Sequence, residues 1–293
     1  MFDRFPNIDW PTPYGVMLAL ACVAGWWLAR HRARSHGVDA SHVDLALPLA
    51  MIGGVGLVQV MGTFVPNELI ATRNTLLAEH RFRLPAIATA CLVMAFLYCR
   101  IAHLSLRGFA DTIAPGALLG IALLRIGCFL AGCCFGRIAG TVVALDVVTS
   151  PAVQLPIQAR SALSGDAIPW AVRFPAGSFA FHQHVALGLI DPEAAQSLPV
   201  HPVQLYESAA VLLLCALVLR VPAGRFRPGT AALVAFAGYA IIGFLLQFLR
   251  ADNALVLGPL SVPQLIYLAW LAVVPFLAVA VHSSVGPGSR AIA

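Results

Sequence analysis

The sequence contains no lysine and few charged residues of any kind. All 18 basic residues among its 293 are arginine, and charged residues make up only 11% of the chain. Without lysine, the chain has no Schiff-base lysine, no lysine general base and no Walker-type phosphate loop. A soluble domain carries about 25% charged residues. The scarcity of charge therefore excludes a soluble enzyme, a disordered chain and a fibrous one.

What the chain has instead is long apolar runs, with 60% hydrophobic residues and a mean hydropathy of +0.86. A helix needs roughly 20 mainly apolar residues to cross a bilayer, and the runs predict an all-α polytopic membrane protein with about seven transmembrane helices. The predicted spans are residues 14–28, 45–65, 84–102, 113–135, 203–219, 229–249 and 262–281. We expect a single membrane domain over 1–293, with a more polar insertion at 136–201 and a flexible tail at 283–293.

The arginines predict the orientation in the membrane, because cytoplasmic ends of spans carry an excess of positive charge. Arg30, Arg32 and Arg34 follow the first span, whereas Asp3 and Asp9 precede it. We therefore expect the N-terminus outside, the C-terminus in the cytoplasm and the insertion on the outer face. This bias accounts for the net charge of +5, and the scattered arginines form no patch that would indicate nucleic acid.

A charge inside a predicted span is costly and marks a candidate functional site, and Arg125 is the clearest case. Arg125 is near the middle of the fourth span, with Cys128 and Gly136 on the same helical face. A guanidinium keeps its charge and can bind a phosphate through two hydrogen bonds. Arg125 is therefore either a phosphate ligand or a structural residue bonded to backbone carbonyls or to a buried carboxylate.

Four polar side chains gather where the fifth span begins, at His201, Gln204, Tyr206 and Glu207. A histidine can act as a general base near neutral pH, and Glu207 can pair with an arginine or orient the histidine. The alternative is a helix N-terminal cap with an interfacial tyrosine. His80, before the third span, is either a second candidate base or an exposed loop residue.

The sixth span carries a further polar stripe, with Tyr239, Gly243 and Arg250 on one face and Gln247 close by. Arg250 either supports the phosphate site or extends to the membrane interface. Tyr239 is either a site residue or an interfacial aromatic.

Three cysteines, Cys128, Cys133 and Cys134, form a CxxxxCC pattern. This spacing matches no common metal site, so we expect no metal there. A disulfide among these thiols fits the pattern better, although the spacing does not establish one.

These residues resemble those of a known family, the prolipoprotein diacylglyceryl transferases of bacterial membranes. The sequence HPVQLYE at 201–207 is close to the family's HPxQLYE motif, and the segment from Arg125 to Arg137 resembles its signature segment. Further similar positions are 14–17, 110–115, 169–175, 239, 250–252 and 260–264. The chain departs from the family pattern at Cys128, Cys133 and Gly243, where the family has Asn, Glu and Arg.

The resemblance implies transfer of a diacylglyceryl group from phosphatidylglycerol to the lipobox cysteine thiol of prolipoproteins. It also implies a location in the bacterial inner membrane, contact with membrane lipid and no cofactor. The implied catalytic residues are His201, His80, Tyr239 and Tyr206, and the implied substrate-binding residues are Arg125, Arg250, Tyr14, Gly136, Gln204, Glu207 and Cys128. Two alternatives stay open: a lipid-binding or accessory membrane protein of the same fold with impaired catalysis, and a related lipid transferase with a different acceptor.

Overall fold

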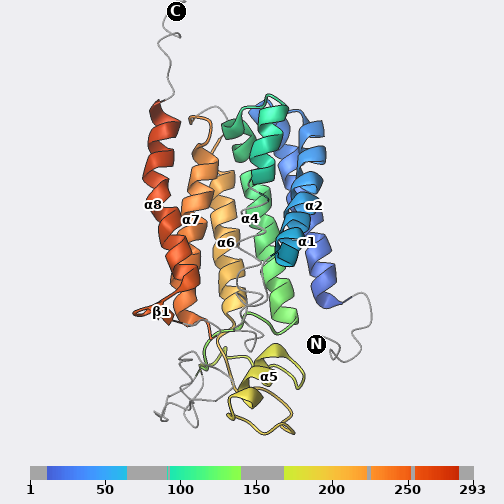
Figure 1. Cartoon of the computed structure of the whole chain (residues 1–293), viewed down its shortest axis with the longest axis vertical. Helices are drawn as coiled ribbons and strands as arrows, with labels where there is room; N and C mark the ends of the chain where they lie inside the picture. The colour runs from blue at the N-terminus through green and yellow to red at the C-terminus, as the bar shows by residue number, and fades with distance from the viewer. Residues whose placement is uncertain are drawn as a thin grey trace, which may run out of the picture.

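The computed structural model describes residues 12–64, 91, 93–139, 168–222, 226–251 and 255–283. It is a bundle of long helices, with α5 and its flanking loops beyond one end (Figure 1). The helices are α1 (Pro13–Ala33), α2 (Ala40–Phe64), α4 (Leu106–Leu130), α5 (Phe179–Ala186), α6 (Val203–Leu219), α7 (Thr230–Leu246) and α8 (Val262–Ser283). Residues 93–101 are also helical. Two 3-10 turns, η1 (Arg34–His36) and η2 (Gln247–Leu249), extend α1 and α7, and the hairpin β1 (Leu255–Leu257) and β2 (Leu260–Ser261) precedes α8.

The helix boundaries follow the apolar runs closely at α6 and less closely at α4. Helix α6 covers the predicted span 203–219, whereas α4 begins earlier than residue 113 and ends before residue 135. It ends there because Gly132 and Cys134 adopt left-handed backbone conformations, with φ of 67° and 60°. Much of the predicted span at 84–102 and the predicted tail after Ser283 lie outside the described residues.

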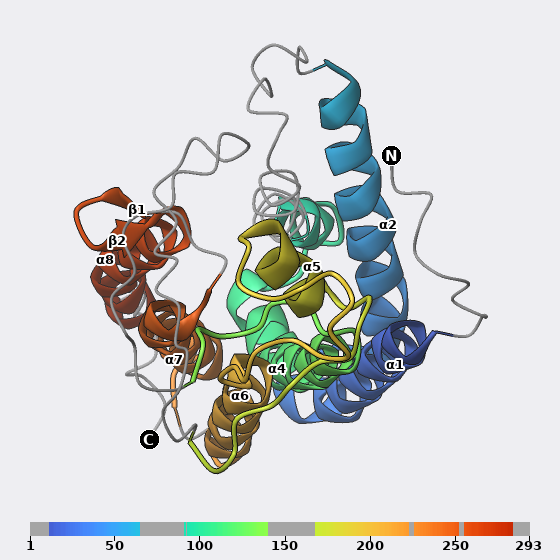
Figure 2. The same cartoon turned by 90° about the horizontal axis from the view of Figure 1, so that it is seen from below.

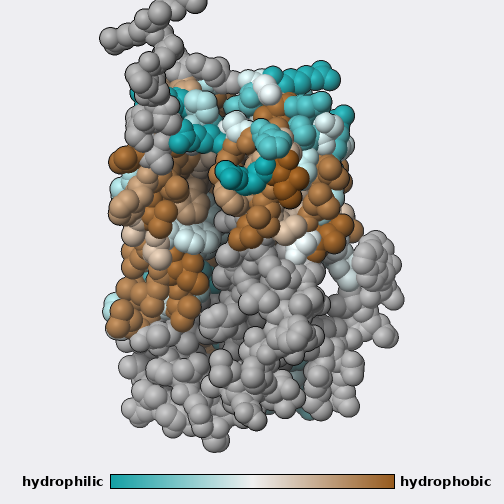
Figure 3. Space-filling view, turned by 45° about the horizontal axis from the view of Figure 1, so that its top comes forward, coloured by the Kyte–Doolittle hydropathy of each residue, from teal (hydrophilic) through white to brown (hydrophobic). Residues whose placement is uncertain are grey.

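Three helices in the described part of the chain are long and apolar enough to cross a bilayer: Leu106–Leu130, Thr230–Leu249 and Val262–Val279. Large apolar side chains such as Leu213 and Phe276 are exposed, at 64% and 76%. The space-filling view shows hydrophobic sides below a hydrophilic end (Figure 3). Contact of such a surface with lipid acyl chains is favourable, whereas its contact with water is unfavourable. The fold is therefore that of an all-α membrane protein.

Helix α4 is the central element of the bundle. It packs closely on α1, because a Cβ at Gly116 would collide with the carbonyl oxygen of Gly25. Small residues permit this approach in a membrane, where helix association depends on close van der Waals packing. On its other side α4 shares a core with α6, in which Ala122 and Val211 are fully buried. The view along the bundle shows α4 between α1 and α6 (Figure 2).

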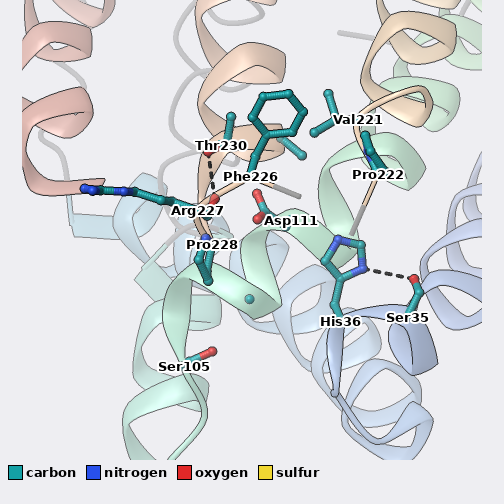
Figure 4. A pocket seen from close by; sticks show the side chains of 12 residues that line it. Ser35, His36, Ser105, Asp111, Val221, Pro222, Phe226, Arg227, Pro228 and Thr230 are labelled. Atoms are coloured by element: carbon teal, nitrogen blue, oxygen red, sulfur yellow. Dashed lines mark hydrogen bonds between the residues drawn. The ribbon is translucent and has the colours of Figure 1, made fainter. Parts of the chain in front are cut away.

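Asp111 joins α4 to the start of α7. Its buried carboxylate accepts hydrogen bonds from the backbone N–H groups of Gly229 at 2.6 Å and Ala232 at 2.8 Å. The first N–H groups of a helix have no partner within it, and a negative charge beside them is favourable. Asp111 also lines a cavity of about 400 Å³ together with His36 and Arg227 (Figure 4). This cavity lies at the opposite end of α4 from Arg125.

The segment before α6 is tied to the end of α4 by a buried histidine. His184 of α5 is 3% exposed, and its Nδ1 accepts a hydrogen bond from the Leu198 N–H at 3.2 Å. Its ring meets Phe135 edge to face, with centroids 5.9 Å apart. Burial lowers the pKa of His184 to about 4, because desolvation penalises the imidazolium. His184 is therefore neutral near pH 7.

Replacing Asp111 with alanine should lower the free energy of unfolding by about 1–3 kcal/mol, because the N–H groups of Gly229 and Ala232 lose their acceptor. Thermal melting of the detergent-solubilised protein measures the effect. Asp191→Ala is the matched control, since the side chain of exposed Asp191 accepts from the Glu193 N–H within its own loop. Equal melting shifts for the two variants would contradict the role of Asp111 in joining the helices.

The segment 168–201 should lose stability as the pH falls from 6.5 towards 4. The unfolded histidine takes up a proton near its ordinary value of 6.5, whereas folded His184 resists protonation until about pH 4. Stability in this window should fall by about 1.4 kcal/mol per pH unit. Hydrogen exchange at the Leu198 amide, corrected for its intrinsic rate, measures this slope. The same slope in a His184→Gln variant would show that another group is responsible.

Candidate functional site

Arg125 and Glu207 form a buried ion pair inside the bundle. The Nη2 atom of Arg125 on α4 lies 2.9 Å from Oε1 of Glu207 on α6, and the side chains are 14% and 5% exposed. Removing one partner of a buried pair leaves an uncompensated charge and costs about 3–5 kcal/mol. Each of these two charges therefore stabilises the other.

Two tyrosines from the next helices complete this part of the site. The Tyr239 hydroxyl of α7 donates to Glu207 Oε1 at 3.3 Å, and its ring meets Tyr267 of α8 edge to face at 6.2 Å. The Tyr267 ring occupies the space beside Gly243, where a Cβ would collide with it. Tyr267 therefore fills the space that the missing side chain of Gly243 leaves.

Sequence reasoning missed Tyr267. The available signal was Gly243 itself, because a glycine in an apolar helix leaves room for a bulky side chain of a neighbouring helix. The sequence does not identify that neighbour, since the contact joins α7 to α8.

His201, Tyr206 and Trp170 form a second group where α6 begins. The Trp170 Nε1–H donates to the Tyr206 hydroxyl at 2.8 Å, and that hydroxyl lies 3.4 Å from His201 Nδ1. Burial lowers the pKa of His201, which favours a neutral imidazole able to accept a proton. The indole of Trp170 is a contact that the sequence did not predict. The other candidate base, His80, lies outside the described residues.

The turn after α4 brings three thiols together. The Sγ atoms of Cys128, Cys133 and Cys134 all lie within 4.8 Å of one another, and all seven cysteines of the chain are free thiols. Gln204 of α6 donates from Nε2 to the Cys133 carbonyl at 2.7 Å. Its own buried Oε1 atom has no hydrogen-bond partner. The CxxxxCC spacing favoured a disulfide among these thiols, whereas the structure has three free thiols in one cluster.

The remaining predicted residues surround the turn. Tyr14 of α1 packs against α4, and its Cδ2 lies 3.4 Å from where a Cβ on Gly127 would be. Gly136 and Arg250 pair in an antiparallel β-bridge. A Cβ on Gly136 would come within 2.6 Å of the His201 carbonyl oxygen, so only glycine fits this position.

The structure therefore brings Arg125 and Tyr239 together on Glu207, whereas His201 pairs with Tyr206 nearer the end of the bundle. The first group offers a permanent positive charge in a low-dielectric setting, which stabilises an anion strongly. The second offers a neutral base. Together the two groups suit a reaction in which an anion leaves and a base removes a proton from the attacking group.

Comparison with known proteins gives matches along most of the chain. The sequence model of the family described as prolipoprotein diacylglyceryl transferase matches residues 7–280. A Geobacter sulfurreducens protein named phosphatidylglycerol–prolipoprotein diacylglyceryl transferase is 25% identical over 290 residues, covering 90% of this chain and 91% of that protein. A protein of the same name from Thermosynechococcus vestitus is 25% identical over 274 residues, covering 92% and 86%.

Other matches are shorter. A Clostridium tetani protein of the same name is 26% identical over 140 residues, covering 47% of this chain and 56% of that protein. The chain thus spans about half the length of that relative. The family match itself extends over residues 7–280 and includes Arg125, Glu207 and Tyr239. The chain therefore belongs to the prolipoprotein diacylglyceryl transferase family.

Proposed function

We propose that the protein is a phosphatidylglycerol–prolipoprotein diacylglyceryl transferase. It moves the diacylglyceryl group of phosphatidylglycerol to the lipobox cysteine thiol of a prolipoprotein. The observation that carries this proposal is the buried Arg125 guanidinium, which Glu207 holds at 2.9 Å and whose other N–H donors can bind a lipid phosphate. Family membership over residues 7–280 supports the same activity.

We also infer the topology: one membrane domain of seven spans in the bacterial inner membrane, with the N-terminus outside and the C-terminus in the cytoplasm. In support, α1 ends in Arg30 and Arg32, and this end of α1 lies away from α5 (Figure 1). Positive charge favours the cytoplasmic side, so the insertion at 136–201 is extracytoplasmic. Arg125 then lies about 8 Å along the axis from the outer end of α4, at 1.5 Å per residue, within reach of an outer-leaflet phosphate.

Arg125 stabilises the leaving group in this reaction. The acceptor thiolate attacks the glyceryl carbon, the S–C bond forms, and the C–O bond to phosphate breaks. The electron pair leaves with glycerol 1-phosphate, whose charge the guanidinium neutralises. A guanidinium has five N–H donors, and the ion pair with Glu207 uses Nη2. Arg125 can therefore hold Glu207 and a phosphate together.

His201 is the base that removes the thiol proton. When its Nδ1–H donates to the Tyr206 hydroxyl, Nε2 is left as a proton acceptor. Trp170 donates to the same hydroxyl and so positions Tyr206. Tyr239 donates to Glu207 and keeps that carboxylate directed at Arg125.

Arg125→Ala should lower the rate of transfer by about 10²–10³, the loss typical of removing one donor to a developing anion. The assay uses purified protein, phosphatidylglycerol and a lipobox peptide, and mass spectrometry follows the added diacylglyceryl group. Arg34→Ala is the matched control, because Arg34 is exposed in η1 at the other end of the bundle. It should transfer at the parent rate.

Two results would contradict these assignments separately. If Arg125→Ala transfers as fast as the parent, the site is wrong although the activity is right. If the parent leaves the peptide unmodified while the Geobacter sulfurreducens relative modifies it, the transferase proposal fails. A lipid-binding or accessory role, or a transferase with another acceptor, would then replace it.

A further inference from the structure

The sulfur cluster at the end of α4 has the composition of a metal site. Cys128 lies in the last turn of α4, and Cys133 and Cys134 follow in the turn, with all three Sγ atoms within 4.8 Å of one another. Cys134 adopts φ of 60°, a left-handed conformation that few residues other than glycine adopt. Such strain persists where the surrounding structure holds it, and it is frequent at functional sites.

The donor set indicates which ion would bind. Thiolates are soft ligands that favour zinc or copper(I) over magnesium or calcium. Among the described residues, the group contains these three cysteines and no histidine or carboxylate. A structural zinc site has four protein ligands, whereas a catalytic one has three and an open fourth position. Three cysteines therefore match the catalytic type.

The surroundings of the cluster contain two arginines and an acceptor without a partner. Three thiolates and a divalent zinc ion together carry one negative charge, and Arg125 lies three residues before Cys128 on α4. Arg250 is held at this turn by its β-bridge to Gly136. Gln204, bonded to the Cys133 carbonyl, is 1% exposed and its Oε1 has no partner. That oxygen can accept a hydrogen bond from a bound peptide.

We propose that Cys128, Cys133 and Cys134 bind a zinc ion whose fourth position receives the acceptor thiol of the prolipoprotein. This inference rests on the proposed transferase function. It departs from the expectation drawn from the CxxxxCC spacing, because the turn at Gly132 folds the three sulfur atoms together. Cys128 is three residues after Arg125, and residues three apart are neighbours on a helix surface. The bound thiol would therefore lie beside the phosphate-binding arginine.

Coordination changes how the thiol is activated. A thiol bound to zinc loses its proton outright, and that proton passes to His201, the base of the proposed reaction. The sulfur then forms its bond to the glyceryl carbon while the C–O bond to phosphate breaks, and the electron pair leaves with the phosphate. No electron transfer occurs, so the step needs no oxidant or reductant. Zinc here supplements His201 as the means of making the nucleophile.

The test measures metal binding by the full-length protein, reduced, stripped with a chelator and kept anaerobic. Titration with Cd²⁺, a spectroscopic substitute for zinc, should produce a sulfur-to-cadmium charge-transfer band that saturates at one equivalent. Adding a lipobox peptide should strengthen the band through a fourth thiolate, and the peptide with its cysteine replaced by serine should not. Absence of the band from the reduced parent protein would overturn the proposal.

Matched variants locate the site. The variant with Cys128, Cys133 and Cys134 changed to serine should lose the band, whereas the variant with the other four cysteines changed to serine should keep it. Since the triple variant can fail to fold, Cys133→Ser alone, checked by circular dichroism, should also lose saturation at one equivalent. A band that survives in the folded Cys133→Ser protein at the parent's affinity would contradict the assignment.

Activity separates this inference from the function on which it rests. If the metal-free protein transfers lipid as fast as the zinc-loaded protein, thiol activation by zinc is overturned while the transferase stands. If the protein binds Cd²⁺ and the peptide thiol but transfers no lipid, the metal site is supported and the transferase is overturned.

Discussion

A guanidinium that cannot lose its proton lies inside a bundle whose sides are apolar, and the rest of the site depends on how that charge is held. Glu207 meets Arg125 at 2.9 Å, and Tyr239 donates to the same carboxylate. Because an unpaired charge at this depth is expensive, the pair forces α4, α6 and α7 into one arrangement. In the proposed function the same guanidinium binds the lipid phosphate, so one side chain would serve both the fold and the chemistry.

Helix α4 connects the structural and the chemical parts of the molecule. At one end Asp111 satisfies the first amides of α7, and in the middle Gly116 lets α1 approach its backbone. At the other end the chain turns at Gly132 and gathers three thiols. Because α4 is packed on both sides, it holds these groups at fixed positions relative to one another. Precise positioning in a site requires such support.

Features that depend on neighbouring residues in the sequence could be predicted, whereas contacts that depend on how the helices pack could not. The span 203–219 could be predicted because Pro202 and Arg220 bound an unbroken apolar run. Arg125 and Glu207 stood out because charges are rare in such runs. The contact of Tyr267 with Gly243 could not be predicted, since it joins two helices. The three thiols were expected to pair in a disulfide, whereas they form a cluster of free thiols, because their geometry depends on the turn at Gly132, where helical periodicity ends.

We propose that Arg125 binds the lipid phosphate. The dipolar coupling between the lipid phosphorus and the guanidinium nitrogens of Arg125 measures this contact directly. Solid-state NMR of nitrogen-15 arginine-labelled protein in phosphatidylglycerol bilayers provides it, with the Arg125→Gln protein as the reference. The parent protein should show a phosphorus–nitrogen coupling as large as direct contact gives, and the Arg125→Gln protein should lack it. The same coupling in both proteins would show that another arginine binds the phosphate and would contradict the account.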